Sequence, residues 1–434
     1  MSYEKRLSSL ISKGYFPKEL PPVFSTASFG ECISNILDEW QTKKIFTNIP
    51  SGKVPGKKKK KRNSYGYRVE SADLEIISMP KRVYERRNIH ITHPIPQALL
   101  SYELSKNWKT VQKWLSRQTF SMDEIRISDN YYRSIKGINF SAHSAKKAYI
   151  ESASDWLVKT DISRFYPTIY THSITWAAYG KEKVKRNINL YTGSLADRID
   201  SLTRACNRNQ TIGIPIGPES SRVISEIISS RIDELFKARI SNIPTQGVDR
   251  LQDDWFVGTR SLENAETILS SVTSIYREFG LDINGHKTSI DRIIANSGTS
   301  WISEIGAFLS HKSGPIRGGR LKELLSICLR LQTENPNDRV INYALSIIES
   351  QRFGYRDVEY LESFLLKSAV ISPISMDRIC RIFVNLKNDT GKISKKTIYD
   401  RFKILAERNL ENGNLYEVIW LIYTLRGLKN TFEL

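Results

Sequence analysis

The chain has 434 residues, of which 40% are hydrophobic and 26% charged, so it is long enough for about two or three domains with sizeable cores. Lys and Arg number 65 against 46 Asp and Glu, a net charge of +19 that predicts a polyanionic partner, and nucleic acid fits best. No stretch approaches about eighteen uninterrupted apolar residues, which argues against a membrane partner. Four scattered cysteines and the lack of a secretory signal favour a cytoplasmic protein.

Residues 1–71 are expected to form an N-terminal segment with one amphipathic helix and a basic loop. Ile33, Leu37 and Trp40 recur at helical spacing, which predicts a helix over 29–40. The basic run consists of Lys57, Lys58, Lys59, Lys60, Lys61 and Arg62. Mutual repulsion predicts a mobile loop, which either binds nucleic-acid phosphates or is a solvated linker.

The next stretch, 72–155, begins with two strand-like patterns, LEIISMP and RRNIHI, and continues with apolar residues at helical spacing from Leu99 to Trp114. Cationic side chains cluster between the two strands, at Lys81, Arg82, Arg86 and Arg87. They either bind the phosphates of a substrate or protect a sheet edge. His90 and His93 are expected to serve structure or bind backbone groups rather than zinc.

Two acidic motifs organise the chain. Residues 156–162 alternate as in a strand buried on one face, which puts Asp161 at the end of the strand with its carboxylate beyond the sheet. Further along, VDRLQDDWFVG predicts a hairpin with Asp253 and Asp254 at its tip.

Adjacent carboxylates repel each other unless they are solvated or neutralised by cations. A third carboxylate on a neighbouring strand makes a divalent-metal site the natural solution. Oxygen-only ligands suit Mg²⁺ or Mn²⁺, and two ions about 4 Å apart would clamp the attacking and leaving oxygens of a phosphoryl transfer. The alternative is that Asp253 and Asp254 form an ordinary turn and that Asp161 caps a helix.

Between and after these motifs lie further signals. The stretch 180–210 is a basic insertion, and in TIGIPIGPESS the glycine at Gly217 allows a close approach of backbone to a ligand. Periodic apolar residues predict a helix over 262–279, ended by Gly280. Lys287 follows an Asn-Gly turn and is either functional or a surface lysine. Over 313–434, apolar residues recur at helical spacing and are interrupted by Pro and Gly. This pattern predicts an all-helical domain.

The tracts DISRFY, QTIGIPIGPESS, LQDDW and GLDINGHKT, in this order, resemble the palm of the reverse transcriptases. Within that group the chain resembles the bacterial defence-associated (abortive-infection and anti-phage) enzymes. The resemblance runs from about Ser78 to Phe308 and implies an α+β right-hand polymerase fold. It assigns fingers to 72–155, palm to 156–312 with the insertion 180–210, and an all-α thumb or C-terminal domain to 313–434. WISEIGAFLS matches the closing hairpin of the palm.

The resemblance also implies the roles of particular residues. Asp161, Asp253 and Asp254 would hold two Mg²⁺ ions, with Mn²⁺ as a substitute, and Lys287 would protonate the departing pyrophosphate. Tyr166 resembles a steric gate against ribonucleotides. The other residues expected at the nucleotide are Arg87, Lys81, Arg86, Gly217 and Ile162.

Two positions depart from the family pattern. Ile216 stands where many relatives have Gln, and Leu251 stands where Tyr commonly opens the paired-aspartate motif. Both are expected at the bound nucleic acid rather than at the metal ions. Untemplated extension and priming from a protein hydroxyl therefore remain open.

The expected function is RNA-directed DNA synthesis from dNTPs, in phage defence in the bacterial cytoplasm. The partners would be an RNA template or noncoding RNA and the DNA product, and a second polypeptide or a homo-oligomer is left open. One alternative is a mobile-element reverse transcriptase of the retron or group II intron type. Another is a catalytically silent RNA-binding scaffold.

Overall fold

The computed structural model describes residues 1–50, 65–82, 85–240, 245–293, 300–311 and 314–428. Contacts divide the chain into two compact units. The first comprises 1–17, 25–75 and 90–296, and the second comprises 18–24, 76–89 and 297–434. None of the helices within the described ranges combines the length and apolar content needed to cross a bilayer.

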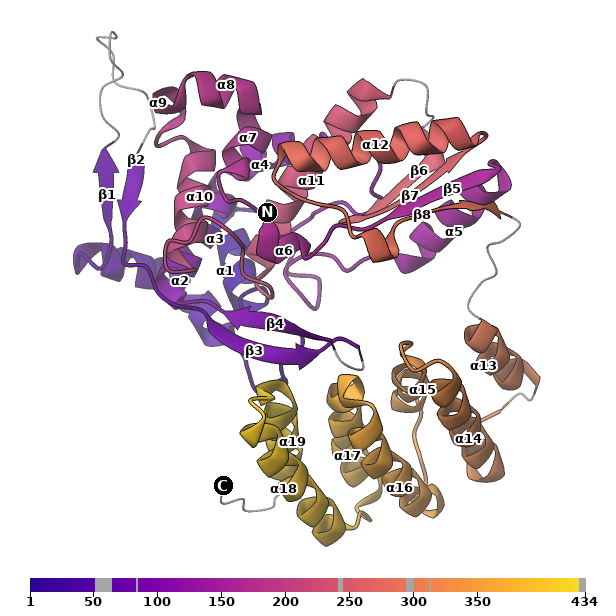
Figure 1. Ribbon diagram of the computed structural model, residues 1–434. Helices are drawn as coiled ribbons and strands as arrows, with labels where there is room; N and C mark the ends of the chain where they lie inside the picture. Colours follow the sequence, from indigo (N-terminus) through magenta and orange to yellow (C-terminus); the bar gives the residue numbers. More distant parts are fainter. Residues whose placement is uncertain (51–64, 83–84, 241–244, 294–299, 312–313, 429–434) are drawn as a thin grey trace. The chain divides into compact units, whose positions relative to one another are not determined.

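The centre of the first unit is a four-stranded antiparallel sheet with the strand order β6-β7-β5-β8 (Figure 1). Its strands are β5 (Trp156–Thr160), β6 (Val248–Leu251), β7 (Asp254–Thr259) and β8 (Ser289–Arg292). The predicted strand after residue 155 and the predicted hairpin around the paired aspartates are both confirmed. As the inner strand between β7 and β8, β5 brings its end close to the turn of the hairpin.

Helices cover the two faces of this sheet differently, as Figure 1 shows for α12 and α5. On one face, Val158 and Val257 pack in the main core with residues of α11 (Glu219–Arg239) and α12 (Leu262–Glu278). On the other face, Ile150 of α5 (Phe140–Ser152) packs against Leu157 and Phe256. The sequence predicted burial of β5 on one face alone, which is wrong, because α5 supplies an apolar cover for Leu157 as well. That second cover stops short of the strand end that carries Asp161.

The remaining elements of the first unit surround this core. A second, two-stranded antiparallel sheet pairs β1 (Thr47–Pro50) with β2 (Tyr65–Arg68). The predicted N-terminal helix is confirmed as α2, and the predicted helices after residue 96 as α3 and α4. The helices are α1 (Tyr3–Ser12), α2 (Ala27–Thr42), α3 (Pro94–Lys106), α4 (Trp108–Leu115), α6 (Phe165–Thr168), α7 (Ser173–Tyr179), α8 (Lys181–Arg186), α9 (Ile188–Tyr191) and α10 (Leu195–Ala205).

The second unit combines most of the hairpin β3 (Glu75–Pro80) and β4 (Arg86–Ile91) with a series of helices. These helices are α13 (Ser300–His311), α14 (Gly318–Glu334), α15 (Val340–Glu349), α16 (Tyr355–Ile371), α17 (Met376–Thr390), α18 (Lys395–Glu411) and α19 (Leu415–Gly427). They end where Pro and Gly interrupt the apolar spacing, so the prediction of an all-helical C-terminal region is confirmed. Among the residues described from 300 onward there is no strand.

The predicted closing hairpin WISEIGAFLS is wrong, because these residues form α13. Trp301 and Ile305 are four residues apart and both buried, a spacing that puts them on one side of a helix. The indole of Trp301 donates a hydrogen bond to Asp338 at 2.8 Å and packs edge-on against the ring of Tyr343. Side-chain contacts of α13 are thus made with the C-terminal helices.

Candidate active site

Strand register brings three of the sequence-predicted residues together. Thr160 pairs with Trp255 across β5 and β7, so the next opposite pair is Asp161 and Asp254. Lys159 pairs with Ser289 across β5 and β8, so two positions further Asp161 faces Lys287, in the short 3₁₀ turn Gly285–Lys287. Residues opposite each other in an antiparallel sheet point to the same face. A carboxylate and an ammonium therefore flank Asp161, one on each side.

The fourth residue, Asp253, lies in the turn of the β6–β7 hairpin. Leu251 pairs with Asp254, which leaves only Gln252 and Asp253 to connect the strands. Gln252 has a φ of 57°, in the left-handed region that side chains other than glycine rarely adopt. The carboxylate of Asp161 raises the pKa of both Asp253 and Asp254. The tight turn thus gathers three carboxylates at one edge of the sheet.

The three carboxylates oppose each other's ionisation. Burial, followed by the charges of Asp161 and Asp254, raises the pKa of Asp253 to about 8. Burial and Asp161 also raise the pKa of Asp254, while Lys287 and Lys147 act in the opposite direction. For Lys287, burial disfavours the charge, but the ion pair with Asp161 outweighs burial and raises the pKa. The three carboxylates thus outnumber the two ammonium groups, of Lys287 and Lys147, that act on them.

The donor set fits divalent cations. Carboxylate oxygens are the ligands that Mg²⁺ and Mn²⁺ prefer, and a bound cation would remove the repulsion that disfavours ionisation here. Over the described parts of the chain, no group of three or more His, Cys, Asp or Glu side chains is already arranged around a metal position. At Asp161 the Lys287 ammonium instead binds one carboxylate oxygen. Asp161, Asp253 and Asp254 are the residues that would hold the ions.

Tyr166 lies beside this cluster, on the short helix α6. Its hydroxyl and that of Ser225 on α11 are 3.0 Å apart, and its carbonyl accepts a hydrogen bond from the amide of Ile214 at 3.0 Å. Burial raises the pKa of Tyr166 to about 12, and the charge of Asp253 adds to the shift. Ile162, also expected at the nucleotide, has a buried side chain and forms a β-bridge to Ile283.

The glycine motif is hydrogen-bonded to His90 on strand β4. The amide of Ile216 donates a hydrogen bond to His90 Nδ1 at 2.9 Å, and the amide of His90 donates to the Ile216 carbonyl at 2.8 Å. Burial lowers the pKa of His90 to about 4, consistent with a neutral acceptor ring. A Cβ at Gly217, which has a φ of 131°, would lie 2.5 Å from Pro17 Cγ. His90 therefore binds backbone, as predicted, and the close approach predicted at Gly217 is made with protein.

The cations expected at the nucleotide have carboxylate partners within the second unit. Arg86 binds both carboxylate oxygens of Glu417 at 2.7 Å, and that carboxylate is buried. Arg87 pairs with Glu19 at 2.9 Å, and Lys81 with Glu85 at 2.7 Å. Their predicted role remains a prediction. Among the other predicted nucleic-acid contacts, Leu251 ends β6 half-buried, and 57–62 lie outside the described residues.

Two charged groups near the carboxylates were missed by the sequence reasoning. Lys147 on α5 acts on the pKa of Asp254, and its ammonium lies 5.3 Å from the ring centre of Phe256. Arg250 on β6 is fully buried between Glu226 and Asp233. A signal for Arg250 existed, since alternation in VDRL puts it on the same side of the strand as Val248.

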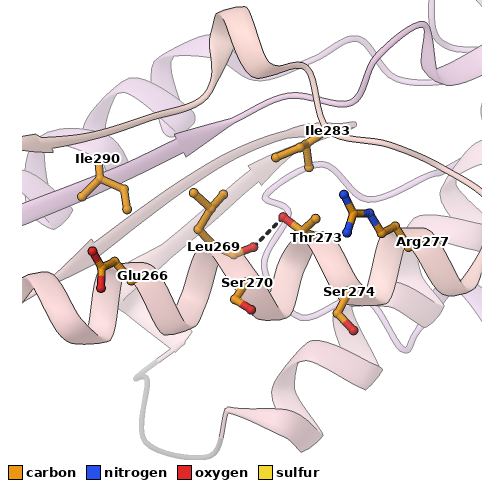
Figure 2. A pocket seen from close by; sticks show the side chains of 8 residues that line it. All are labelled: Glu266, Leu269, Ser270, Thr273, Ser274, Arg277, Ile283 and Ile290. Carbon is orange, nitrogen blue, oxygen red and sulfur yellow. Dashed lines mark hydrogen bonds between the residues drawn. The ribbon is translucent and has the colours of Figure 1, made fainter.

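A groove of about 450 Å³ lies between α12 and β8, on the other face of the sheet (Figure 2). Ile290 lines it and pairs with Val158, whose side chain points to the α12 face and away from Asp161. The Thr273 hydroxyl donates to the Leu269 carbonyl of its own helix at 2.7 Å. The groove is thus separate from the carboxylate cluster.

An antiparallel sheet backed by helices, with two carboxylates on a hairpin turn and a third at the end of the neighbouring strand, is the palm of a nucleic-acid polymerase. Residues 100–309 match the family described as reverse transcriptase (RNA-dependent DNA polymerase). The chain therefore contains a reverse transcriptase domain in a polymerase fold followed by a helical C-terminal region. Its enzyme class is RNA-directed DNA polymerase, a nucleotidyltransferase.

Solved structures similar to the chain include yeast telomerases. Apo telomerase from Candida tropicalis is 12% identical, with a TM-score of 0.36 over 97% of this chain and 73% of that one. The same telomerase in complex with a TWJ fragment of telomeric RNA is 12% identical, with a TM-score of 0.37 over 96% and 68%. Telomerase from Candida albicans, with the same kind of RNA fragment, is 12% identical, with a TM-score of 0.32 over 87% and 72%. No curated protein matches the chain significantly.

Proposed function

We propose that this polymerase synthesises DNA from dNTPs by a two-metal mechanism at Asp161, Asp253 and Asp254. The observation that carries the proposal is the strand register that sets Asp161 opposite Asp254 and Lys287, with Asp253 in the adjoining turn. Divalent ions bound by these carboxylates would lower the pKa of the attacking hydroxyl and stabilise the charge on pyrophosphate. Enzymes of the reverse transcriptase family generally use divalent metal ions, which supports metal binding by these aspartates.

The residues of the chain would divide the remaining work. The three aspartates would hold the ions that bind the incoming triphosphate, and the Tyr166 ring would lie under the sugar. Lys287 is protonated and adjacent to Asp161, so it can donate a proton to the leaving pyrophosphate. The attacking group is the 3′-hydroxyl of a primer, or a protein hydroxyl if priming is protein-based.

We further propose that the enzyme acts in the bacterial cytoplasm in defence against phage. This setting rests on the sequence resemblance to defence-associated reverse transcriptases. An RNA template or noncoding RNA is the proposed partner, supported by the net charge of +19. The departures at Ile216 and Leu251 leave room for unconventional templating.

The experiment that tests the proposed activity is incorporation of each labelled dNTP by the purified chain with Mg²⁺. It is run before and after removal of co-purifying RNA, and the products are treated with protease. DNA synthesis that stops on chelation of the metal is the expected result. Product lost with the RNA identifies a template or RNA cofactor, and product whose mobility shifts on proteolysis is attached to protein. No incorporation under any condition, with the chain folded, would leave the scaffold alternative.

Tyr166→Ala is expected to reduce the preference for dNTPs over rNTPs at least about 10-fold, because the smaller side chain no longer excludes a 2′-hydroxyl. The measurement is the ratio of kcat/KM values for a matched dNTP and rNTP. Tyr166→Phe is the control, since it keeps the ring and loses only the hydroxyl that contacts Ser225. Equal loss in both variants would assign the effect to that contact and not to the ring.

A further inference from the structure

Strand β6 carries two consecutive charged residues that are both fully buried. Asp249 is 1% exposed and Arg250 is 0% exposed. Asp249 pairs with Phe256 on the α5 face of the sheet, and Arg250 points to the α11 face. Burying charges is costly unless they are paired and hydrogen-bonded, so each needs partners in the protein. The strand precedes the turn that holds Asp253.

The two charges have different kinds of partner. Asp249 binds the ring of His143 on α5, with 2.9 Å to Nδ1, and also lies near Lys146. Arg250 binds Glu226 Oε1 through Nη2 at 2.6 Å and Asp233 Oδ1 through Nε at 2.6 Å. Both acids are on α11, so the guanidinium is fixed by two carboxylates of one helix.

Arg250 also makes one hydrogen bond outside this ionic group, to the turn between β6 and β7. Its Nη1 donates to the carbonyl oxygen of Gln252 at 2.7 Å. That carbonyl belongs to the same planar peptide unit as the amide of Asp253. Gln252 is also the residue with the unfavourable left-handed φ. A fixed donor on this oxygen therefore sets the orientation of the peptide that carries Asp253.

Helix α11 connects this anchor with the nucleotide side of the site. Ser225, which contacts the Tyr166 hydroxyl, directly precedes Glu226, which binds Arg250. Asp233 also accepts hydrogen bonds from the amides of Thr119 and Phe120, at 3.1 and 3.4 Å. The helix that contacts Tyr166 is thus the helix that holds the guanidinium.

We propose that Arg250 is a positioning residue of the polymerase site, which sets the carboxylate of Asp253 for metal binding through the Gln252 carbonyl. The inference rests on the proposed two-metal function. A buried ionic group that served only stability would be replaceable by neutral side chains of similar size. The bond to the turn makes Arg250 different, because no apolar side chain can donate to that carbonyl.

The test compares variants in which buried charged residues that bind each other are replaced together. The triple variant Arg250→Met, Glu226→Gln and Asp233→Asn removes the whole ionic group together with the bond to Gln252. Its matched control is Asp249→Asn with His143→Gln, which neutralises the buried pair on the opposite face of the same strand and does not touch the turn. Folding is checked by circular dichroism and thermal melting.

The direct readout is Mn²⁺ binding by the full-length protein, measured by electron paramagnetic resonance. We expect the triple variant to bind Mn²⁺ about 10- to 100-fold more weakly, as for other residues that orient metal ligands. Its kcat for dNTP incorporation should fall with little change in the KM for dNTP. The control should bind Mn²⁺ within about 2-fold of wild type.

A folded triple variant with wild-type Mn²⁺ affinity would overturn the assignment of Arg250. If the triple variant does not fold, Arg250→Lys takes its place, because one ammonium keeps the charge but cannot reach both acids and the turn. The Mn²⁺ affinity of Arg250→Lys then decides whether Arg250 positions the metal ligand. Wild-type protein that binds no Mn²⁺ would instead refute the two-metal function itself, so the two failures are distinguishable.

Discussion

Asp253→Asn is expected to slow nucleotide incorporation at least about 10³-fold, because it removes a ligand from the metal ions on which the chemistry depends. The substitution keeps the size of the side chain in the turn and removes one of three carboxylates that repel each other. The melting temperature without metal should therefore equal or exceed that of the wild type. Single-turnover incorporation with Mg²⁺ and a thermal melt in chelator are the two measurements.

Asp282→Asn is the matched control, since this aspartate is exposed and its carboxylate pairs at 3.5 Å with another exposed residue, Arg277. Its activity should stay within about 2-fold of the wild type. Affinity for nucleic acid should be nearly unchanged in Asp253→Asn, because phosphate contacts come from basic side chains. Sustained synthesis by a folded Asp253→Asn enzyme would remove this aspartate from the catalytic group.

Glu103→Ala is expected to destabilise the first unit by about 3–5 kcal/mol, because it leaves a buried cation without its partner. The Glu103 carboxylate is 0% exposed and binds Arg198 at 2.9 Å, with Arg198 itself 5% exposed. It also accepts from the hydroxyls of Tyr65 and Tyr67 on β2, at 2.5 and 2.6 Å, and from Asn107 at 3.0 Å. The glutamate thus joins the β1–β2 hairpin to two helices.

The measurement for Glu103 is urea unfolding followed by tryptophan fluorescence. Glu103→Gln keeps an acceptor for the tyrosine hydroxyls, so its free energy of unfolding should fall by less, about 1–3 kcal/mol. Glu39→Ala, in an exposed pair with Lys43, should change stability by no more than about 0.5 kcal/mol. A loss in Glu103→Ala as small as that of the surface control would show that Arg198 finds other partners.

Much of the fold could be predicted because the core follows simple periodicity. The apolar side of 262–279 is uninterrupted, so α12 was predicted within one residue of its observed end at Glu278. Alternation around Asp161 and the apolar runs beside Asp253 were enough to predict the strands of the palm. These patterns carry the information because the side chains concerned are buried against one continuous core.

The predictions failed where burial does not follow hydrophobicity. Glu103 is indistinguishable in sequence from a solvated charge, and only the positions of its distant partners, Tyr65, Tyr67 and Arg198, make it internal. The family resemblance predicted a hairpin for residues 301–310, although Trp301 and Ile305 have helical spacing. For Arg86, the partner Glu417 lies 331 positions away, which no local pattern can indicate. Long-range pairing is the information that a single sequence lacks.

The cross-strand register has a consequence for how this sheet can change in evolution. Deleting one residue from 156–160 would turn Asp161 toward the α12 face, because successive side chains alternate. A two-residue change would restore the face but move the carboxylate about 7 Å along the strand, away from Asp254. Neither change can be compensated by side-chain choice. Related chains can therefore tolerate many substitutions in these strands. Insertions and deletions within the strands should be selected against most strongly.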